Sequence, residues 1–287
     1  MESDKQPVKL AYLIVAHYQP EHLTRLIGAL NHEGSHFFIH LDAKAHLPSF
    51  QDAVRGFDNL AFAPDRVLVE WGKFSVLQAI LKVLRMAVLS AGPFRYYTVL
   101  SGSDYPIKHK RAIQNCLQSA GRQYIRIDRR LTSAPKNAHS YFIKNLPDGK
   151  YFGAMTPYHG SMFWSLTEEC IHYVLDFIES NPGYLDIHRH IFAPEEVLFQ
   201  TIVKHSRFAG MVTQDYSNGI YPDRTHHANH FIDWQGLRVR ENLTLDERDF
   251  DDLCASQALF ARKFDQNKST KLLALLDAYV HHFEFPQ

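Results

Sequence analysis

The segment Tyr96-Tyr-Thr-Val-Leu-Ser-Gly-Ser-Asp-Tyr-Pro106 decides the fold class of this chain. Its first five residues are aromatic, β-branched or aliphatic, and they predict a buried β-strand. The small residues, the carboxylate of Asp104 and the proline that follow predict a loop at the carboxyl end of that strand. Ligands of α/β proteins bind just beyond such strand ends. The segment therefore predicts an α/β sheet with a binding loop around Asp104.

Two earlier segments have the same pattern. Residues 10–16 form an apolar run that ends at His17, and residues 37–41 form another that ends at Asp42. Carboxyl ends of parallel strands meet at one edge of a sheet. The three strand ends therefore predict one nucleotide-type crevice.

Helices and strands alternate along the first half of the chain, which predicts parallel strands joined by crossover helices. Pro20 opens a helix whose Leu23, Leu26, Ile27 and Leu30 share one face. Further strands are predicted at 66–69, 124–127 and 161–164, and further helices at 75–89, 110–119, 197–205, 249–256 and 269–283, with one more after a capping box over 165–168. Residues 129–157 lack a clear period and predict a long functional loop or a small subdomain.

Composition predicts one compact α/β unit over residues 1–287. The chain has 287 residues, of which 45% are hydrophobic, and no clean linker interrupts it. We expect residues 8–128 to form a nucleotide-binding half and residues 129–287 to form an acceptor and catalytic half.

Charge and cysteine content limit the partners. The 31 basic and 31 acidic residues balance, so no overall field attracts nucleic acid. Three widely spaced cysteines predict a reducing compartment. The first strand begins too early for a signal peptide, and no apolar run reaches the roughly 18 residues of a membrane span. We expect a cytoplasmic protein without an integral membrane segment, for which peripheral association with the inner face of the membrane stays open.

Glu195 and Glu196 follow Pro194 at a predicted helix start. One interpretation is that these acids only complement the helix dipole. The other uses the same physics: a carboxylate near a helix N-terminus stays ionised, so it could accept a proton from an incoming hydroxyl.

Three cations in the last third of the chain also have two interpretations. Arg240, Arg262 and Lys263 are either solvated surface charges or a clamp for a diphosphate. Lys263 is the most specific of them, because Phe260 and Phe264 would bury the backbone on either side of it.

Metal and cofactor motifs are weak. The histidine clusters at 188–190 and 226–230 lack zinc-ligand spacing, and Asp249-Phe-Asp251 is interpreted as a helix start. No glycine-rich phosphate loop appears, and no Gly-x-Ser-x-Gly elbow supports a serine hydrolase. We expect no metal and no cofactor.

Seven strings in sequence order carry a family resemblance. They are Ala11-Tyr-Leu-Ile-Val-Ala-His17, His40-Leu-Asp-Ala-Lys44, Glu70-Trp-Gly-Lys73, Leu100-Ser-Gly-Ser-Asp-Tyr-Pro-Ile-Lys108, Gly160-Ser-Met-Phe-Trp164, Ala193-Pro-Glu-Glu196 and Phe260-Ala-Arg-Lys-Phe-Asp265. With them the chain resembles the core 2/I-branching β-1,6-N-acetylglucosaminyltransferases, a family that also contains the peptide xylosyltransferases. It looks like a compact bacterial-type member.

The resemblance implies a GT-A-like (Rossmann-like) fold with a mixed, mainly parallel sheet, and a metal-independent, inverting transfer from a UDP-sugar. The family's catalytic base falls on Glu196, with Glu195 in place of an aspartate. Its diphosphate-binding lysine falls on Lys263. Its arginine partner falls on Arg240 by spacing, with Arg238 as the alternative.

The resemblance also implies contacts to both substrates. Asp42 matches a uridine contact, and the implied nucleotide site further includes Val15, His17, Trp71 and Asp104. Gly160 and Ser161 match a segment near the donor sugar, and Trp234 matches a tryptophan at the acceptor. The family's charged acceptor segment has no clear counterpart within residues 128–144.

These observations predict a glycosyltransferase that moves a sugar, N-acetylglucosamine first among the candidates, from a UDP-sugar to a glycan or glycolipid acceptor. Transfer of xylose or another sugar is the alternative within the family. A glycoside hydrolase would need a second carboxylate facing Glu196, and Asp104 and Asp128 are the candidates. A non-catalytic nucleotide- or glycan-binding module is the third possibility.

Overall fold

The computed structural model describes residues 8–90, 92–119, 121–132, 140–147, 150–218, 225–234 and 243–282. Its centre is a large sheet with the strand order β3-β2-β1-β4-β8-β6-β7, and β9 pairs with β6. The strands are β1 (Leu10–Ala16), β2 (Ser35–Leu41), β3 (Leu60–Phe62), β4 (Tyr96–Ser101), β6 (Gln123–Arg130), β7 (Tyr158–Gly160), β8 (Ser165–Thr167) and β9 (Val212–Asp215).

Strands β3, β2, β1 and β4 run parallel to one another, as the alternating pattern predicted. β8 joins β4 and β6 by antiparallel pairing, β7 is antiparallel to β6, and β9 is parallel to β6. The predicted class, α/β with a mixed and mainly parallel sheet flanked by helices, is confirmed. The predicted boundary near residue 128 falls inside β6, so the sheet crosses it.

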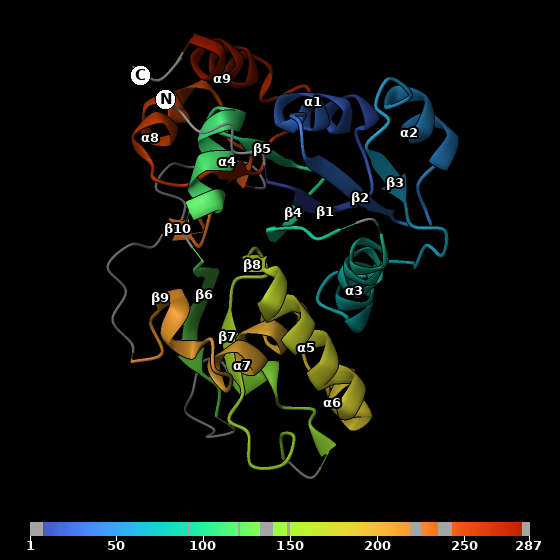
Figure 1. Cartoon of the computed structure of the whole chain (residues 1–287), viewed down its shortest axis with the longest axis vertical. Helices are drawn as coiled ribbons and strands as arrows, with labels where there is room; N and C mark the ends of the chain where they lie inside the picture. Colours follow the sequence, from blue (N-terminus) through green and yellow to red (C-terminus); the bar gives the residue numbers. More distant parts are fainter. Residues whose placement is uncertain are drawn as a thin grey trace.

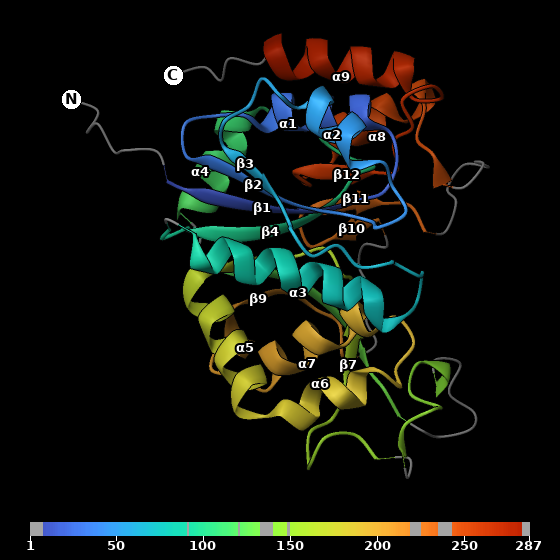
Figure 2. The same ribbon diagram turned by 90° about the vertical axis from the view of Figure 1, so that its right-hand side faces the viewer.

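Alternate residues of β1 face two hydrophobic cores. Leu10, Tyr12 and Ile14 pack with α1 (Pro20–Leu30), α2 (Leu47–Ala53), α4 (Lys110–Ser119), α8 (Phe250–Ala255) and α9 (Thr270–His282). Ala11 and Leu13 pack with α3 (Phe74–Leu89), α5 (Glu168–Ser180), α6 (Pro182–His188) and α7 (Leu198–Lys204). Figures 1 and 2 show these helices on the two sides of the parallel strands. Each large apolar side chain buried in this way contributes about 1.5–3 kcal/mol.

A second, smaller sheet has the order β10-β11-β12-β5. Its strands are β10 (His226–His227), β11 (His230–Ile232), β12 (Phe260–Arg262) and β5 (Asp104–Pro106). β12 and β5 are antiparallel, and Arg262 pairs with Asp104. The segment around Asp104, predicted as a loop, is therefore partly a strand.

Three predicted elements differ from the structure. Residues 66–69 are not a strand, because the N–H of Val67 donates to the side chain of His40 rather than to a neighbouring strand. Residues 161–164 connect β7 to β8 and form no strand themselves. Helix α5 is capped by Thr167, whose hydroxyl accepts the N–H of Cys170, while Ser165 lies in β8.

The region predicted to be loop or subdomain contributes a third, small core. Leu131, Phe142, Ile143 and Leu146 pack there against residues near 191–197. Phe142 of the short 3-10 helix η1 (Ser140–Phe142) belongs to this core, and so do Ala193 and Val197 on either side of the 3-10 helix η3 (Pro194–Glu196). It fixes the segment that carries Glu195 and Glu196.

Candidate active site

A cavity of about 840 Å³ lies at the carboxyl ends of β1 and β4. It is in the size range of small-molecule sites. The sequence-predicted site residues that line it are Val15, His17, Trp71, Gly160, Ser161, Glu195, Glu196, Trp234 and Lys263. The structure thus brings nine of the predicted residues to one hollow, from segments that span most of the chain.

Two strand ends form one wall of this cavity. Val15 lies in β1 and His17 directly follows it, while Ser101 ends β4 and residues 102–103 follow it. Burial lowers the pKa of His17, and Lys44 and Lys263 lower it further, against the opposing effect of Asp42. Asp42 itself is 5% exposed and does not line the cavity. Its Oδ1 accepts the N–H of Lys44.

Asp104 is fully buried behind this wall and is not part of the cavity lining. Its Oδ2 accepts the N–H of Ser101, and its Oδ1 accepts Nε–H of Arg262 at 3.1 Å. His230 Nε2 lies 3.3 Å from its Oδ2. Burial alone would raise the pKa of Asp104, but the His230 contact and the Arg262 charge outweigh burial and lower it. In this structure Asp104 supports the wall from behind and reaches no ligand space.

Lys263 reaches the cavity from the end of β12. Phe260 and Phe264 on either side are fully buried, as predicted, and the N–H of Phe264 donates to Ser103 at 2.8 Å. Burial and the adjacent Arg262 lower the pKa of Lys263, against the opposing charge of Asp104. Arg262 also lines the cavity, with its guanidinium 4.5 Å from the ring centroid of Phe163.

The segment that carries Glu195 and Glu196 is tied to the Trp71 loop. Ala193, directly before η3, has φ +47°, a left-handed conformation that is costly for a residue with a side chain. Its N–H donates to Gly72 O at 3.0 Å. Gly72 has φ +71°, and a Cβ there would lie 2.5 Å from Phe192, so only glycine fits this contact.

The two glutamates differ in environment. Glu195 is 5% exposed, and its Oε2 has no hydrogen-bond partner among the described residues. Burial, with a contribution from the neighbouring Glu196 charge, raises the pKa of Glu195 to about 8. A low pKa near a helix start was expected for this pair, and for Glu195 that expectation is wrong because desolvation dominates. Glu196 is partly exposed and meets His159 Nε2 at 3.1 Å.

His159 and Asp128 are polar cavity residues that were not assigned a role from the sequence, although Asp128 was considered as a second carboxylate. Asp128 is 7% exposed, and its Oδ1 accepts Nε–H of Arg126 at 2.6 Å. The only sequence signal for His159 is its place directly before Gly160. A Cβ at Gly160 would lie 1.8 Å from Arg126 O, so β7 approaches β6 closely because this residue is a glycine.

Exposed aromatic side chains form the rim of the cavity. Trp71 is 84% exposed, Trp234 is 48% exposed and Tyr141 is 43% exposed. Trp71 packs edge-on against Phe192, with ring centroids 5.3 Å apart. Trp71, predicted at the nucleotide, thus contacts the segment before Glu195.

Four further predictions concern the two arginines, the helix start at Asp249, metal sites and membrane-spanning helices. Arg240 and Arg238 fall outside the described residues. The predicted helix start at Asp249 is confirmed, since α8 begins at Phe250 with Asp249 as its N-cap, directly after the 3-10 helix η6 (Glu247–Asp249). Across the part of the chain that the structure describes, no group of three or more His, Cys, Asp or Glu residues is arranged to hold a metal ion. The same part contains no helix both long and apolar enough to cross a bilayer.

Two curated xylosyltransferases are similar to the chain in sequence. Xylosyltransferase 2 of Homo sapiens is 24% identical over 304 residues, and Xylosyltransferase 1 of Rattus norvegicus is 22% identical over 302 residues. These alignments cover 97% and 96% of the chain but 34% and 36% of the two relatives. The chain therefore spans about a third of the length of these curated relatives.

A crystal structure of S. aureus TarS 1-349 is also similar, at a TM-score of 0.40 and 9% identity, over 73% of this chain and 58% of that one. Such a score is too low to support an inference about function. The profile of the Core-2/I-Branching enzyme family, in contrast, matches residues 10–253. That match covers the cavity residues from Val15 to Trp234 and ends in α8, before Arg262 and Lys263. The chain belongs to the Core-2/I-Branching enzyme family, a family of glycosyltransferases.

Proposed function

We propose that this protein is a UDP-sugar-dependent glycosyltransferase that inverts the donor sugar and needs no metal ion. One observation carries the proposal: a single cavity is lined both by the carboxylate of Glu196 and by the ammonium of Lys263. A displacement at the anomeric carbon requires a proton acceptor for the attacking hydroxyl and positive charge for the departing diphosphate.

The proposed step is one displacement. Glu196 takes the proton from an acceptor hydroxyl, and that oxygen forms the new bond to the anomeric carbon. The bond from this carbon to the UDP oxygen breaks, and its electron pair stays on the diphosphate beside Lys263. Attack from the side opposite the leaving group inverts the configuration and gives a β-linked product from an α-linked donor.

Metal independence is supported by the cations of the cavity. Lys263 and Arg262 both line it, and the family resemblance adds Arg240 or Arg238. A charge pair at about 4 Å is worth on the order of 4 kcal/mol at an effective dielectric of about 20. Stabilisation of that size on the departing diphosphate corresponds to nearly three decades in rate.

The sugar proposed first is N-acetylglucosamine, with xylose as the alternative that the names of the curated relatives favour. The proposed acceptor is a glycan or glycolipid hydroxyl in polysaccharide biosynthesis. The exposed aromatic rim supports this acceptor class, because flat aromatic faces suit the apolar faces of sugar rings. We propose action in the cytoplasm, with no nucleic acid as partner.

A glycoside hydrolase is the second candidate function. Asp128 lines the cavity, and Glu195, with its raised pKa of about 8, is a potential acid beside Glu196. Two observations weigh against it: Arg126 holds Asp128 in an ion pair, and the family is one of transferases.

Calorimetry with UDP, UDP-N-acetylglucosamine, UDP-xylose, UDP-glucose and UDP-galactose in excess EDTA tests the proposal, together with UDP release by each donor. We expect UDP to bind as well in EDTA as with manganese, and one donor to release UDP faster than the others. A strict need for a divalent ion would contradict metal independence. Absence of UDP binding, with cleavage of a simple glycoside, would favour the hydrolase.

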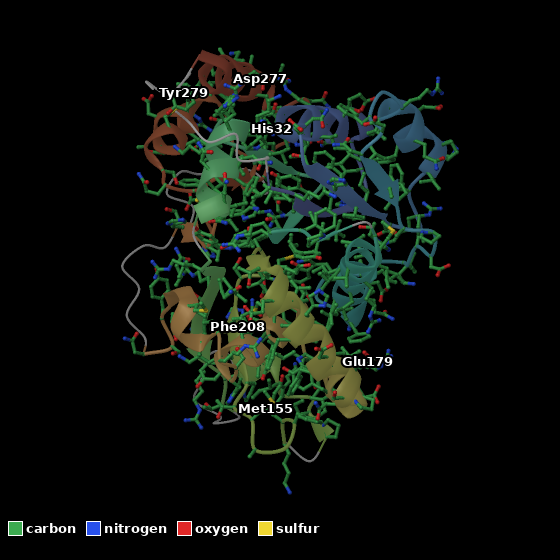
Figure 3. The ribbon with its side chains drawn as sticks, viewed as in Figure 1. His32, Met155, Glu179, Phe208, Asp277 and Tyr279 are labelled. Atoms are coloured by element: carbon green, nitrogen blue, oxygen red, sulfur yellow. The ribbon has the colours of Figure 1, made fainter. Side chains whose placement is uncertain are left out.

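Glu196→Gln should lower sugar transfer by about 10²–10⁴-fold, because the amide cannot accept the proton. UDP affinity should stay within about twofold, since the nucleotide does not need the base. Glu179→Gln is the matched control: Glu179 is an exposed residue of α5, labelled in Figure 3, and does not line the cavity. An active Glu196→Gln enzyme with a dead Glu195→Gln enzyme would reverse the assignment of the pair.

A further inference from the structure

A row of charged and polar side chains lies behind Glu196. His159 Nε2 is 3.1 Å from Glu196 Oε2, and His159 Nδ1 is 3.8 Å from Asp128 Oδ2. Asp128 Oδ1 is 2.6 Å from Arg126 Nε. The row therefore runs from the proposed base into the sheet and ends at a guanidinium.

These side chains are shielded from water. The exposed fractions of the side chains of His159, Asp128 and Arg126 are 13%, 10% and 5%. Electrostatic contacts in such surroundings are weakly screened and hold their groups in fixed places. Ion pairs of the same chemistry on the surface are strongly screened by water and salt and do not hold their groups in fixed places.

The backbone is shaped to make the row. Ile127 pairs with Gly160 and Arg129 with His159, so β6 has one extra residue at this point, and that residue is Asp128. Bulges of this kind redirect a side chain and occur next to active sites. Here the bulge lies where Asp128 faces the cavity beside His159.

A ring contact fixes the plane of the imidazole. The centroids of Phe142 and His159 are 4.4 Å apart, and Phe142 belongs to the small core that also supports η3. His159 thus packs against the ring of Phe142, and Asp128 Oδ2 lies 3.8 Å from its Nδ1, beyond hydrogen-bond distance. Its other nitrogen is left for Glu196.

We propose that His159 is a positioning residue for Glu196, which it orients through an Nε2–H donated to one carboxylate oxygen. With Glu196 ionised, the 3.1 Å contact requires this proton, because two lone pairs at that distance would repel. The donated bond fixes one oxygen of Glu196 and leaves the other to take the proton of the acceptor hydroxyl. Asp128, paired with Arg126, lies beside the ring but makes no hydrogen bond to it. This inference rests on the proposed function, in which Glu196 is the base.

Kinetic measurements distinguish a positioning role of His159 from a purely structural role. Loss of orientation lowers kcat and leaves donor binding unchanged, whereas a damaged wall raises KM or unfolds the protein. Partners that orient metal-ligating side chains are worth about ten- to a hundredfold in affinity or activity, and we expect an effect of the same size for a residue that orients the base.

The test compares His159→Gln, His159→Asn and His159→Ala, with UDP-N-acetylglucosamine as donor and water as acceptor, followed by UDP release. The amide N–H of glutamine can take the place of Nε2–H, while the shorter asparagine cannot reach Glu196. We expect His159→Ala and His159→Asn to lose about ten- to a hundredfold in kcat with unchanged KM. His159→Gln should recover most of the loss.

His172→Ala is the matched control, because His172 lies 3.9 Å from Glu168 on the surface of α5, outside the cavity. If His159→Ala does not fold, the comparison of kcat between His159→Gln and His159→Asn decides. Equal kcat values in these two variants overturn the inference. A loss confined to KM also overturns it. Glu196→Gln, run in parallel, separates the proposed function from the role of His159. If Glu196→Gln stays active, the proposed function fails. If Glu196→Gln is inactive while all three His159 variants stay fully active, only the role of His159 fails.

Discussion

Two walls of the cavity each bury a carboxyl group, and they do so in opposite ways. Asp104 is 0% exposed and contacts Ser101, Arg262 and His230. Glu195 is 5% exposed, and its Oε2 lacks a partner within the described ranges. The pKa of Asp104 is therefore lowered, and that of Glu195 is raised to about 8.

The difference shows that burial alone does not set the charge of an acid. Desolvation raises the pKa in both cases, and only Asp104 has the cation and donors that overcome it. The Asp104 wall is therefore a scaffold around an ionised carboxylate that contacts Ser101, Arg262 and His230. The Glu195 wall presents a neutral acid to the cavity near pH 7, which can donate a hydrogen bond to a ligand.

Breaking the scaffold should have the largest effect. Asp104→Asn removes the buried charge that pairs with the partly buried Arg262, and loss of one partner of a buried pair costs about 3–5 kcal/mol. Urea unfolding followed by circular dichroism measures it. The control is Asp186→Asn, which removes an exposed pair with Arg189 at 3.5 Å and should cost less than about 1 kcal/mol. Equal losses in the two variants would mean that burial adds nothing to the Asp104 pair.

Removing the cation beside the scaffold should have an intermediate effect. Lys263→Ala should weaken UDP binding by about ten- to a hundredfold, the equivalent of roughly 1.5–3 kcal/mol for a charged hydrogen bond. Uridine binding should change less, because the ammonium is proposed to contact phosphate, and added salt should reduce the difference. Calorimetry with both ligands measures this.

Lys271→Ala, which removes an exposed lysine paired with Glu247, is the control for general charge loss. Asp42→Ala should instead weaken UDP and uridine alike. Unchanged UDP affinity in Lys263→Ala would return residues 260–265 to a packing role and remove the main support for a metal-free leaving group.

The third prediction concerns the other wall, where the expected effect depends on pH. The ordinary pKa of Glu195 is 4.5 and its folded value is about 8, so the unfolded state loses the proton first as pH rises. The contribution of Glu195 to the free energy of unfolding is fully present below a pH of about 4.5. Between pH of about 4.5 and about 8 it is lost, by about 1.4 kcal/mol per pH unit. Glu195→Gln is neutral throughout and should lack this slope. A stability difference between variant and wild type that is constant from pH 5 to 8 would show that Glu195 is ionised in the fold.

Much of the parallel core could be predicted from the sequence. β1, β2 and β4 are long, apolar runs with polar ends, so period and end point are both visible in the residues. β5 and β12 have three residues each and pair with partners more than 150 positions away, so no local pattern marks them. That pairing is what removes Asp104 from the cavity.

The candidate site divides in the same way. Glu196 and Lys263 were found because each lies in a motif with its own local chemistry, and both line the cavity. His159 was missed because its role depends on a bulge in β6 and on Phe142, neither of which is near it in sequence. The raised pKa of Glu195 depends on packing by the third core and could not be inferred from its neighbours.

The distribution of indole rings gives this protein a built-in optical reporter. Two of its three tryptophans, Trp71 and Trp234, stand exposed at the cavity rim, and the third, Trp164, is fully buried. Emission from the rim pair will lie at longer wavelength and respond to iodide, while Trp164 stays shielded. A ligand that fills the cavity therefore changes the quenchable fraction of the fluorescence, and occupancy can be followed without any label.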